Sequence, residues 1–212
     1  MATSRRRTPP TARQRHEAAR LIAEKGDTYA LEAGIVLKDA PSPLYRLLVL
    51  TTLLSVRINA QIAVAAAREI STAGWRTPRA MADAAWQDVV DALGRAHYKR
   101  YDESTATALH DGAVLLLDRW GGDLRRLRAE ADGDAREIRR LLQEFRRIGP
   151  VGAEIFCREA QGLWPELRPS IDKRALDGAR KAGLPADAPS LAALVAPQEL
   201  PRLAAALVRS TL

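Results

Sequence analysis

Glycines, arginines and a proline stand close together between two apolar-faced segments, at residues 145–153. Gly149 and Gly152 allow a tight turn and a close approach to phosphate. A helix that starts here directs its free N–H groups and positive dipole end at an anion, and Pro150 suits its first turn. Arg146 and Arg147 can add charge-assisted phosphate contacts. The layout is typical of a DNA-binding helix-hairpin-helix, and an ordinary connection in a helical bundle would also explain it.

A second chemical candidate is Asp172, about twenty residues further on, at the expected start of a helix. Aspartate is one of the best N-cap residues, which is a sufficient structural reason for it. The same amides and helix dipole also keep the carboxylate ionised. An ionised carboxylate beside an anomeric carbon can stabilise an oxocarbenium-like transition state or help to activate water. Both interpretations of Asp172 remain open.

The composition excludes several other kinds of site. The 212 residues carry a net charge of +7, which favours a polyanionic partner. A single cysteine, Cys157, excludes an internal disulfide, a four-cysteine zinc site and an iron–sulfur cluster, and we expect no metal ligands. No apolar run reaches the length of a membrane span, and no apolar stretch follows the charged N-terminus as in a secretory signal. We expect no membrane contact and a cytoplasmic protein, nucleoid-associated if the source is bacterial.

Helical signals recur along the rest of the chain, which predicts an all-α fold of about ten helices. Residues 1–11 are expected to form a disordered basic arm. Expected helices cover about 12–25, begin at Pro43, follow Asn59, follow Thr77, and cover 86–93 up to Gly94. A long helix capped by Asp102 extends to Trp120, and a capping box of Asp134 and Glu137 opens one that reaches Ile148. The last helices follow the hairpin, Asp172, Ser190 and Pro197.

In their order, these motifs resemble those of the endonuclease III-like DNA glycosylases of the helix-hairpin-helix superfamily, over roughly residues 40–212. An apolar helix ends there in a Leu-Ser-x-Gln/Arg-like motif, which residues 53–57 match as Leu-Leu-Ser-Val-Arg. The family hairpin, Leu-Pro-Gly-Val-Gly-x-Lys-x-Ala, aligns without a gap to residues 145–153. Ile171 and Asp172 match the apolar residue and catalytic aspartate of the family. The motifs depart from the family at Arg147, which replaces the first hairpin glycine, and at Val151, which replaces the Schiff-base lysine.

The resemblance implies a two-lobed fold over residues 12–212, with one lobe of about 12–41 and 147–212 and another of about 42–146. It implies a monomer that flips a damaged base out of double-stranded DNA, with Asp172 as the catalytic residue and no cofactor. A monovalent cation at the hairpin carbonyls is compatible with it. The residues expected to bind DNA are Arg57, Asn59, Arg146, Arg147, Ile148, Gly149, Pro150, Val151, Gly152, Lys173 and Arg174.

By the same resemblance, the loop before the long helix lies near the active-site cleft. Tyr98 or Tyr101 can stack there on a flipped base, and Asp102 or Glu103 can bind its Watson–Crick edge. A polar helix start with half-buried tyrosines is the structural alternative. Val151 is not a nucleophile, so the expected activity is that of a monofunctional glycosylase. The alternatives are an inactive DNA-binding relative, a bifunctional enzyme that uses another lysine, and a helical protein-interaction domain.

Overall fold

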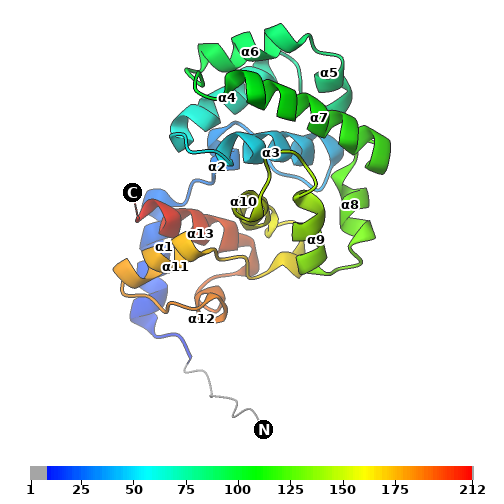
Figure 1. Ribbon diagram of the computed structural model, residues 1–212. Coiled ribbons are helices and arrows are strands. Elements are labelled where there is room, and N and C mark those ends of the chain that lie inside the picture. The colour runs from blue at the N-terminus through cyan, green and yellow to red at the C-terminus, as the bar shows by residue number, and fades with distance from the viewer. Residues whose placement is uncertain (1–8, 212) are drawn as a thin grey trace.

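A computed structural model describes residues 9–211, and this part of the chain is helical without any strand, which confirms the all-α class (Figure 1). Residues 1–8 of the expected basic arm lie outside the described range. Two single 3₁₀ turns, η1 and η2, occur at Pro165–Leu167 and Pro197–Glu199. The α-helices are α1 (Ala12–Lys25), α2 (Tyr29–Glu32), α3 (Pro41–Leu54), α4 (Ala60–Thr72), α5 (Pro78–Ala82), α6 (Trp86–Arg95), α7 (Asp102–Trp120), α8 (Leu124–Glu130), α9 (Ala135–Leu142), α10 (Pro150–Ala160), α11 (Lys173–Lys181), α12 (Ala188–Ala192) and α13 (Leu200–Arg209).

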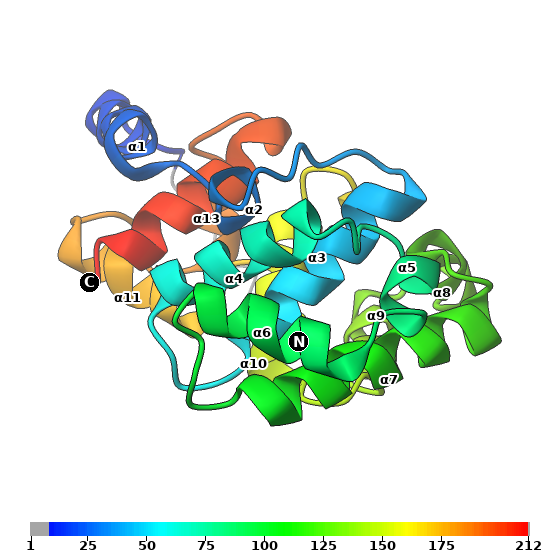
Figure 2. The ribbon, with the colours of Figure 1, turned by 90° about the horizontal axis from the view of Figure 1, so that it is seen from above.

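Buried apolar side chains form two cores. The larger core is built by α2 to α10, with α3 at its centre, buried on nearly every face as its sequence predicts. The smaller core is built by α1, α11, α12 and α13. In both views of the ribbon, α1, α11 and α13 form a group beside the helices α3 to α9 (Figures 1 and 2). The helix α10 lies between this group and α9.

The border between the lobes differs from the expected one near residue 147. The helix that follows the hairpin, α10, lies in the larger core through Phe156 and Cys157. The short helix α2 joins the same core through Tyr29 and Ala30, although it precedes residue 42. The reason is that the apolar face of α10 packs against α3, so the hairpin is an integral part of the larger core.

Several helix ends agree with the sequence prediction because the capping side chain is short and polar. The side chains of Asn59, Thr77 and Asp172 accept hydrogen bonds from the first-turn amides of α4, α5 and α11. Gly121 ends α7 in the left-handed conformation, with φ +61°. The ends of α1, at residues 12 and 25, are also as predicted.

The expected helix from Asp134 to Ile148 is shorter than predicted. Asp134 caps α9, but Glu137 does not complete a capping box, because its carboxylate pairs with Arg140 on the outer face. The helix ends at Leu142, and Phe145 and Ile148 reach the core from the turns that follow. The apolar spacing therefore identified the buried face correctly but overestimated the length of the helix.

Other helix starts and stops differ by a few residues. Asp102 is the first residue of α7, and Tyr101 takes the N-cap position. Gly94 lies inside α6, and α3 begins at Pro41, before Pro43. At the C-terminal end, the signal at Ser190 falls inside α12, which begins at Ala188, and Pro197 starts η2, which continues into α13.

Candidate nucleic-acid interface and active site

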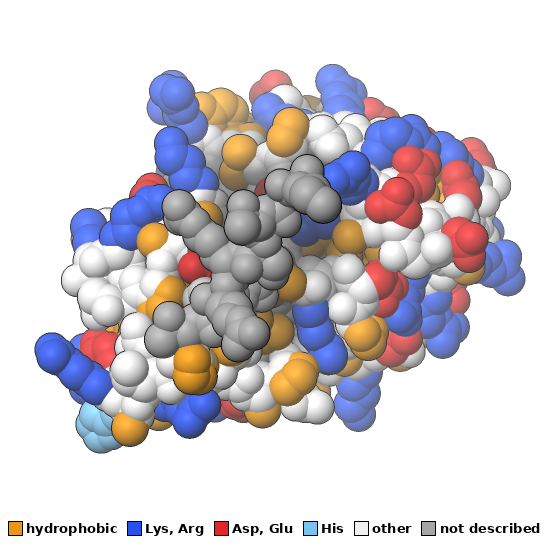
Figure 3. Space-filling view, turned by 90° about the horizontal axis from the view of Figure 1, so that it is seen from below, with side chains coloured by type: hydrophobic (Ala, Val, Ile, Leu, Met, Phe, Trp, Pro, Cys, Tyr) orange, Lys and Arg blue, Asp and Glu red, His pale blue; other side chains and the backbone are white. Residues whose placement is uncertain are grey.

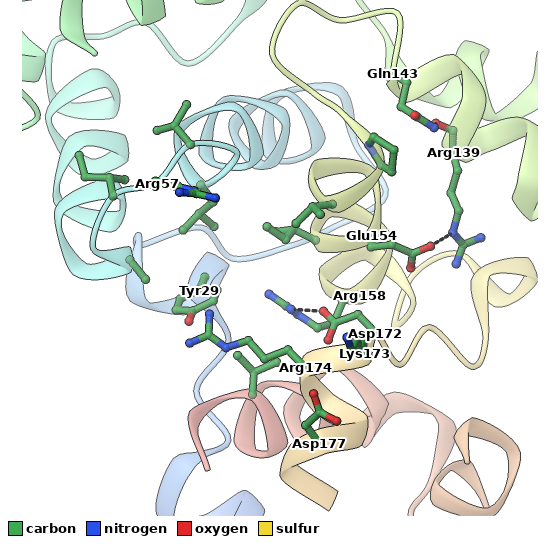
Figure 4. Close-up of a pocket in the computed structure, with 18 residues that line it drawn as sticks. Tyr29, Arg57, Arg139, Gln143, Glu154, Arg158, Asp172, Lys173, Arg174 and Asp177 are labelled. Atoms are coloured by element: carbon green, nitrogen blue, oxygen red, sulfur yellow. Dashed lines mark hydrogen bonds and ion pairs between the residues drawn. The ribbon is translucent and has the colours of Figure 1, made fainter. Parts of the chain in front are cut away.

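A cleft of about 690 Å³ opens where the two cores meet, between the α3–α4 loop, the N-terminal half of α10 and the start of α11 (Figure 4). Its lining combines an apolar wall with several charged side chains. The polar lining residues are Tyr29, Arg57, Arg139, Gln143, Glu154, Arg158, Asp172, Lys173, Arg174 and Asp177. The cleft therefore brings together the hairpin, the end of the apolar helix α3 and Asp172, which are far apart in the sequence.

The backbone of the hairpin turns at Arg147, which has φ +72°. This left-handed conformation normally favours glycine, and the family pattern has glycine here. Gly149 has an extended backbone, with φ −89° and ψ −169°, and a Cβ added to it would meet no atom within 4 Å. The turn therefore does not require glycine at position 149, contrary to the prediction from sequence.

The first turn of α10 offers backbone amides without acceptors. Ala153 N donates to Gly149 O at 3.0 Å and closes the turn, and Gly149 has no side chain to cap it. Within residues 9–211, the amides of Gly149 and Val151 have no hydrogen-bond acceptor, and Val151 is 73% exposed. Both amides lie at the start of α10, the positive end of its helix dipole, and free amides at a helix start are an arrangement that binds anions.

Two hairpin residues have a packing role that the sequence did not indicate. Gly152 is buried, and a Cβ on it would overlap Ser55 Oγ and lie 3.2 Å from Ile148 Cγ2. Ile148 is buried as well, and its amide donates to Phe145 O at 3.0 Å. A direct DNA contact by Ile148 is therefore wrong for this conformation, since neither its side chain nor its amide is free.

The hairpin arginines already have partners on α7. Arg147 donates to Thr105 Oγ1 at 2.8 Å and to Ser104 Oγ at 2.9 Å, and its guanidinium lies 5.5 Å from the centre of the Tyr101 ring. Arg146 pairs with Asp111 at 2.8 Å. Arg147 thus holds the turn against the start of α7, and a phosphate contact predicted for it would compete with these bonds.

The carboxylate of Asp172 is fixed at both oxygens. Oδ1 accepts from Ala175 N at 2.8 Å as the N-cap of α11, and Oδ2 accepts from Arg158 Nη1. The Asp172 side chain is 15% exposed and lines the cleft, so it is held rigidly yet accessible. The expected cap is confirmed, and the side chain is placed where it can face a ligand.

Arg158 extends this network into the interior. Its side chain is 4% exposed, and its Nε lies 3.9 Å from Glu159 Oε1. Glu159 in turn accepts from Ala30 N at 2.9 Å, and its burial raises the pKa of its carboxyl. The Arg158 guanidinium also lies 5.7 Å from the centre of the Tyr29 ring. The network joins α10, α11 and α2 at the base of the cleft.

Cations on the rim give the cleft an excess of positive charge. Arg57, Lys173 and Arg174 line it and have no carboxylate partner within residues 9–211. On the face seen from below, basic, acidic and apolar side chains are intermixed (Figure 3). Asn59 does not line the cleft, because its side chain caps α4 through Gln61 N at 2.8 Å.

The structure contradicts the expected base pocket at the loop before α7. Tyr98 is fully buried and donates to Leu53 O at 3.1 Å, so its ring cannot stack on a base. Tyr101, Asp102 and Glu103 do not line the Asp172 cleft. Tyr101 stacks with arginines, and Asp102 Oδ1 accepts from Glu103 N at 2.9 Å. The loop adjoins the hairpin because Arg147 bridges to it.

Sequence reasoning missed six polar residues of the cleft, namely Tyr29, Arg139, Gln143, Glu154, Arg158 and Asp177. Glu154 pairs with Arg139 at 2.8 Å, and Gln143 donates to Arg139 O at 2.9 Å (Figure 4). Tyr29 comes from the unexpected helix α2. Arg158 could have been found, since Arg158 and Glu159 interrupt the apolar pattern of a helix expected to be buried.

Three further findings bear on the class of protein. Within residues 9–211, no group of three or more His, Cys, Asp or Glu side chains could hold a metal ion. No helix of this range is long and apolar enough to cross a membrane. No family model, curated protein or solved structure matches the chain, so the resemblance described above stays a prediction.

Proposed function

We propose that this protein is a monofunctional DNA glycosylase that hydrolyses the N-glycosidic bond of a damaged or mismatched base in duplex DNA. The observation that carries the proposal is the position of Asp172: its oriented carboxylate lines the same cleft as Val151, whose amide has no acceptor within residues 9–211. An anion-binding helix start beside a fixed carboxylate suits a substrate that has a phosphate next to a sugar which becomes cationic.

Each part of the cleft has a role in this reaction. The amides of Gly149 and Val151 bind a phosphate of the DNA strand, and Lys173 and Arg174 add charge on the rim. Arg57, in the loop between α3 and α4, enters the space that the extruded base leaves in the stack. As the bond from C1′ to the base nitrogen breaks, the electron pair leaves with the base, and Asp172 stabilises the positive charge on the sugar.

Water completes the hydrolysis. Its oxygen bonds to C1′, and its proton ends on the departing base, so that an abasic site and a free base are formed. Val151 stands where related bifunctional enzymes have the attacking lysine, and a valine side chain cannot form a Schiff base. This residue is the reason for proposing hydrolysis rather than strand cleavage.

The test compares wild type with Asp172→Asn on duplexes that carry uracil, hypoxanthine, oxidised, alkylated or mismatched bases. Asn is also a good N-cap, so the cap itself should cost only a few tenths to about 1 kcal/mol, but the buried Arg158 loses its carboxylate partner, which adds up to about 3–5 kcal/mol. Loss of one well-placed electrostatic contact should slow single-turnover base release by about 10² to 10³-fold. A variant that is folded at the assay temperature and releases base at the wild-type rate would show that Asp172 has only a structural role.

One observation favours a second candidate, a DNA-binding protein without catalysis. Both oxygens of Asp172 have partners, and the Arg158 cation offsets its charge. Such a protein would bind duplex DNA, and a plot of the logarithm of its affinity against the logarithm of the salt concentration would have a slope of about −0.9 for each phosphate neutralised. The glycosylase would show the same salt dependence. It would release no base from any duplex of the panel, which separates the two candidates.

A further inference from the structure

Packing alone does not explain why a charged residue, Arg158, is buried at the base of the cleft. A guanidinium with 4% of its side chain exposed is costly to desolvate, and its Nε has no hydrogen-bond partner. Its neighbours along α10, Phe156, Cys157 and Ala160, belong to the larger apolar core. A residue of similar volume without charge would fill this space at a lower desolvation cost.

The hydrogen bond that Arg158 donates fixes the orientation of the Asp172 carboxylate. The α11 cap bond to Ala175 N fixes only Oδ1 of Asp172 and leaves the carboxylate free to rotate about that bond. The bond from Arg158 Nη1 to Oδ2 removes this freedom. Because Arg158 lies two turns after the hairpin on α10, the helix that holds a phosphate at its start also holds the carboxylate.

We propose that Arg158 is a positioning residue, which orients the carboxylate of Asp172 relative to the phosphate-binding start of α10. This inference rests on the proposed function. The positive charge of Arg158 weakens the electrostatic field of the Asp172 carboxylate. If Arg158 acted only through its charge, its replacement by a neutral residue would therefore accelerate base release. Orientation makes the opposite prediction, because a displacement of about 1 Å at a reacting centre can cost about 100-fold in rate.

The experiment is a double-mutant cycle on single-turnover base release, with wild type, Arg158→Gln, Asp172→Asn and the double variant. We expect Arg158→Gln to slow base release by about 10- to 100-fold while DNA affinity stays within about twofold. In the Asp172→Asn background, Arg158→Gln should alter the rate by less than about twofold, because no carboxylate is left for Arg158 to orient. If the two residues acted independently, the two losses in activation free energy would add. A structural role alone would give additive losses or weaker DNA binding.

Three further variants control for folding. Arg158→Gln alone leaves the buried Glu159 without its cation. A double variant, Arg158→Gln with Glu159→Gln, removes both charges, and its rate of base release is compared with that of Glu159→Gln alone. Arg128→Gln is the matched arginine control: Arg128 pairs with Glu166 and stacks on Trp164, away from the cleft. It should lower the melting temperature and leave the rate of base release unchanged.

The outcomes separate the two proposals. An active wild type with additive losses, or with faster release by Arg158→Gln, would overturn the positioning role and leave the glycosylase proposal intact. A wild type that releases no base from any duplex would overturn the proposed function, and the role of Arg158 with it. Non-additive losses together with a normal Arg128→Gln rate would support both.

Discussion

Replacement of Gly149 by alanine should separate DNA binding from folding. The backbone at Gly149 has a negative φ that any residue adopts, and a Cβ there meets no atom within 4 Å. Alanine is a poorer N-cap than glycine, but it restricts the unfolded chain, and these effects of about 0.5–1 kcal/mol oppose each other. The melting temperature should therefore change by no more than about 3 °C.

DNA affinity should fall, because the new methyl group lies where a phosphate must approach the amides of Gly149 and Val151. One hydrogen bond to a charged group contributes about 1.5–3 kcal/mol, which corresponds to roughly 10- to 100-fold in affinity. Fluorescence anisotropy with a labelled duplex at several salt concentrations measures this loss. The loss should be equal for different sequences, since phosphate contacts carry no sequence information.

Gly152→Ala is the control, because it should lower stability, whereas Gly149→Ala should lower DNA affinity. Its Cβ would overlap Ser55 Oγ, so this variant should lose about 1–3 kcal/mol of stability, and Ser55→Ala should restore part of it. Wild-type DNA affinity in Gly149→Ala at every salt concentration would refute the phosphate site at this amide. A large drop in its melting temperature would show that the fold itself requires Gly149.

Three other expectations concern packing, pH and mechanism. Gly178→Ala places a Cβ 2.6 Å from the backbone carbon of Leu207 where α11 crosses α13, so chemical denaturation should show a loss of about 3 kcal/mol. Burial raises the pKa of the Cys157 thiol to about 12. The unfolded thiol ionises near pH 9, so the free energy of unfolding should fall as pH rises from about 9 towards 12, and a thiol reagent should label Cys157 only after unfolding. With Val151 at the lysine position, borohydride should not trap the protein on abasic DNA, and trapping that Lys173→Ala abolishes would contradict monofunctional hydrolysis.

The sequence predicted the local features of the site better than its long-range ones. Caps such as Asn59 and Asp172 were predictable because the bond they make spans two or three residues. The buried face of Ile138, Leu141 and Leu142 was predictable from its spacing. The end of α9 was not, because Phe145 continues the apolar pattern from outside the helix.

Contacts between distant segments account for the errors in the site. The ion pair of Arg158 with Asp172 depends on how α10 and α11 meet, which no local pattern contains. Tyr98 has the side chain of a base-stacking residue, but its hydroxyl reaches Leu53 O, 45 residues away, and becomes part of the core. Arg147 takes a glycine-like conformation that is stabilised by Ser104 and Thr105, in another helix.

The division of the buried side chains into two cores has a consequence for how the molecule unfolds. Ion pairs bridge the cores, namely Arg158 with Asp172 at the cleft and Arg209 with Glu32 at 2.8 Å. The side chains of these two pairs are only 4% to 25% exposed, so salt screens them less than it screens surface pairs. We expect native-state hydrogen exchange to show α1, α11 and α13 opening as a separate cooperative unit, at a free energy that falls only slightly as ionic strength rises. Bound DNA, which would contact both units across the cleft, should suppress that opening.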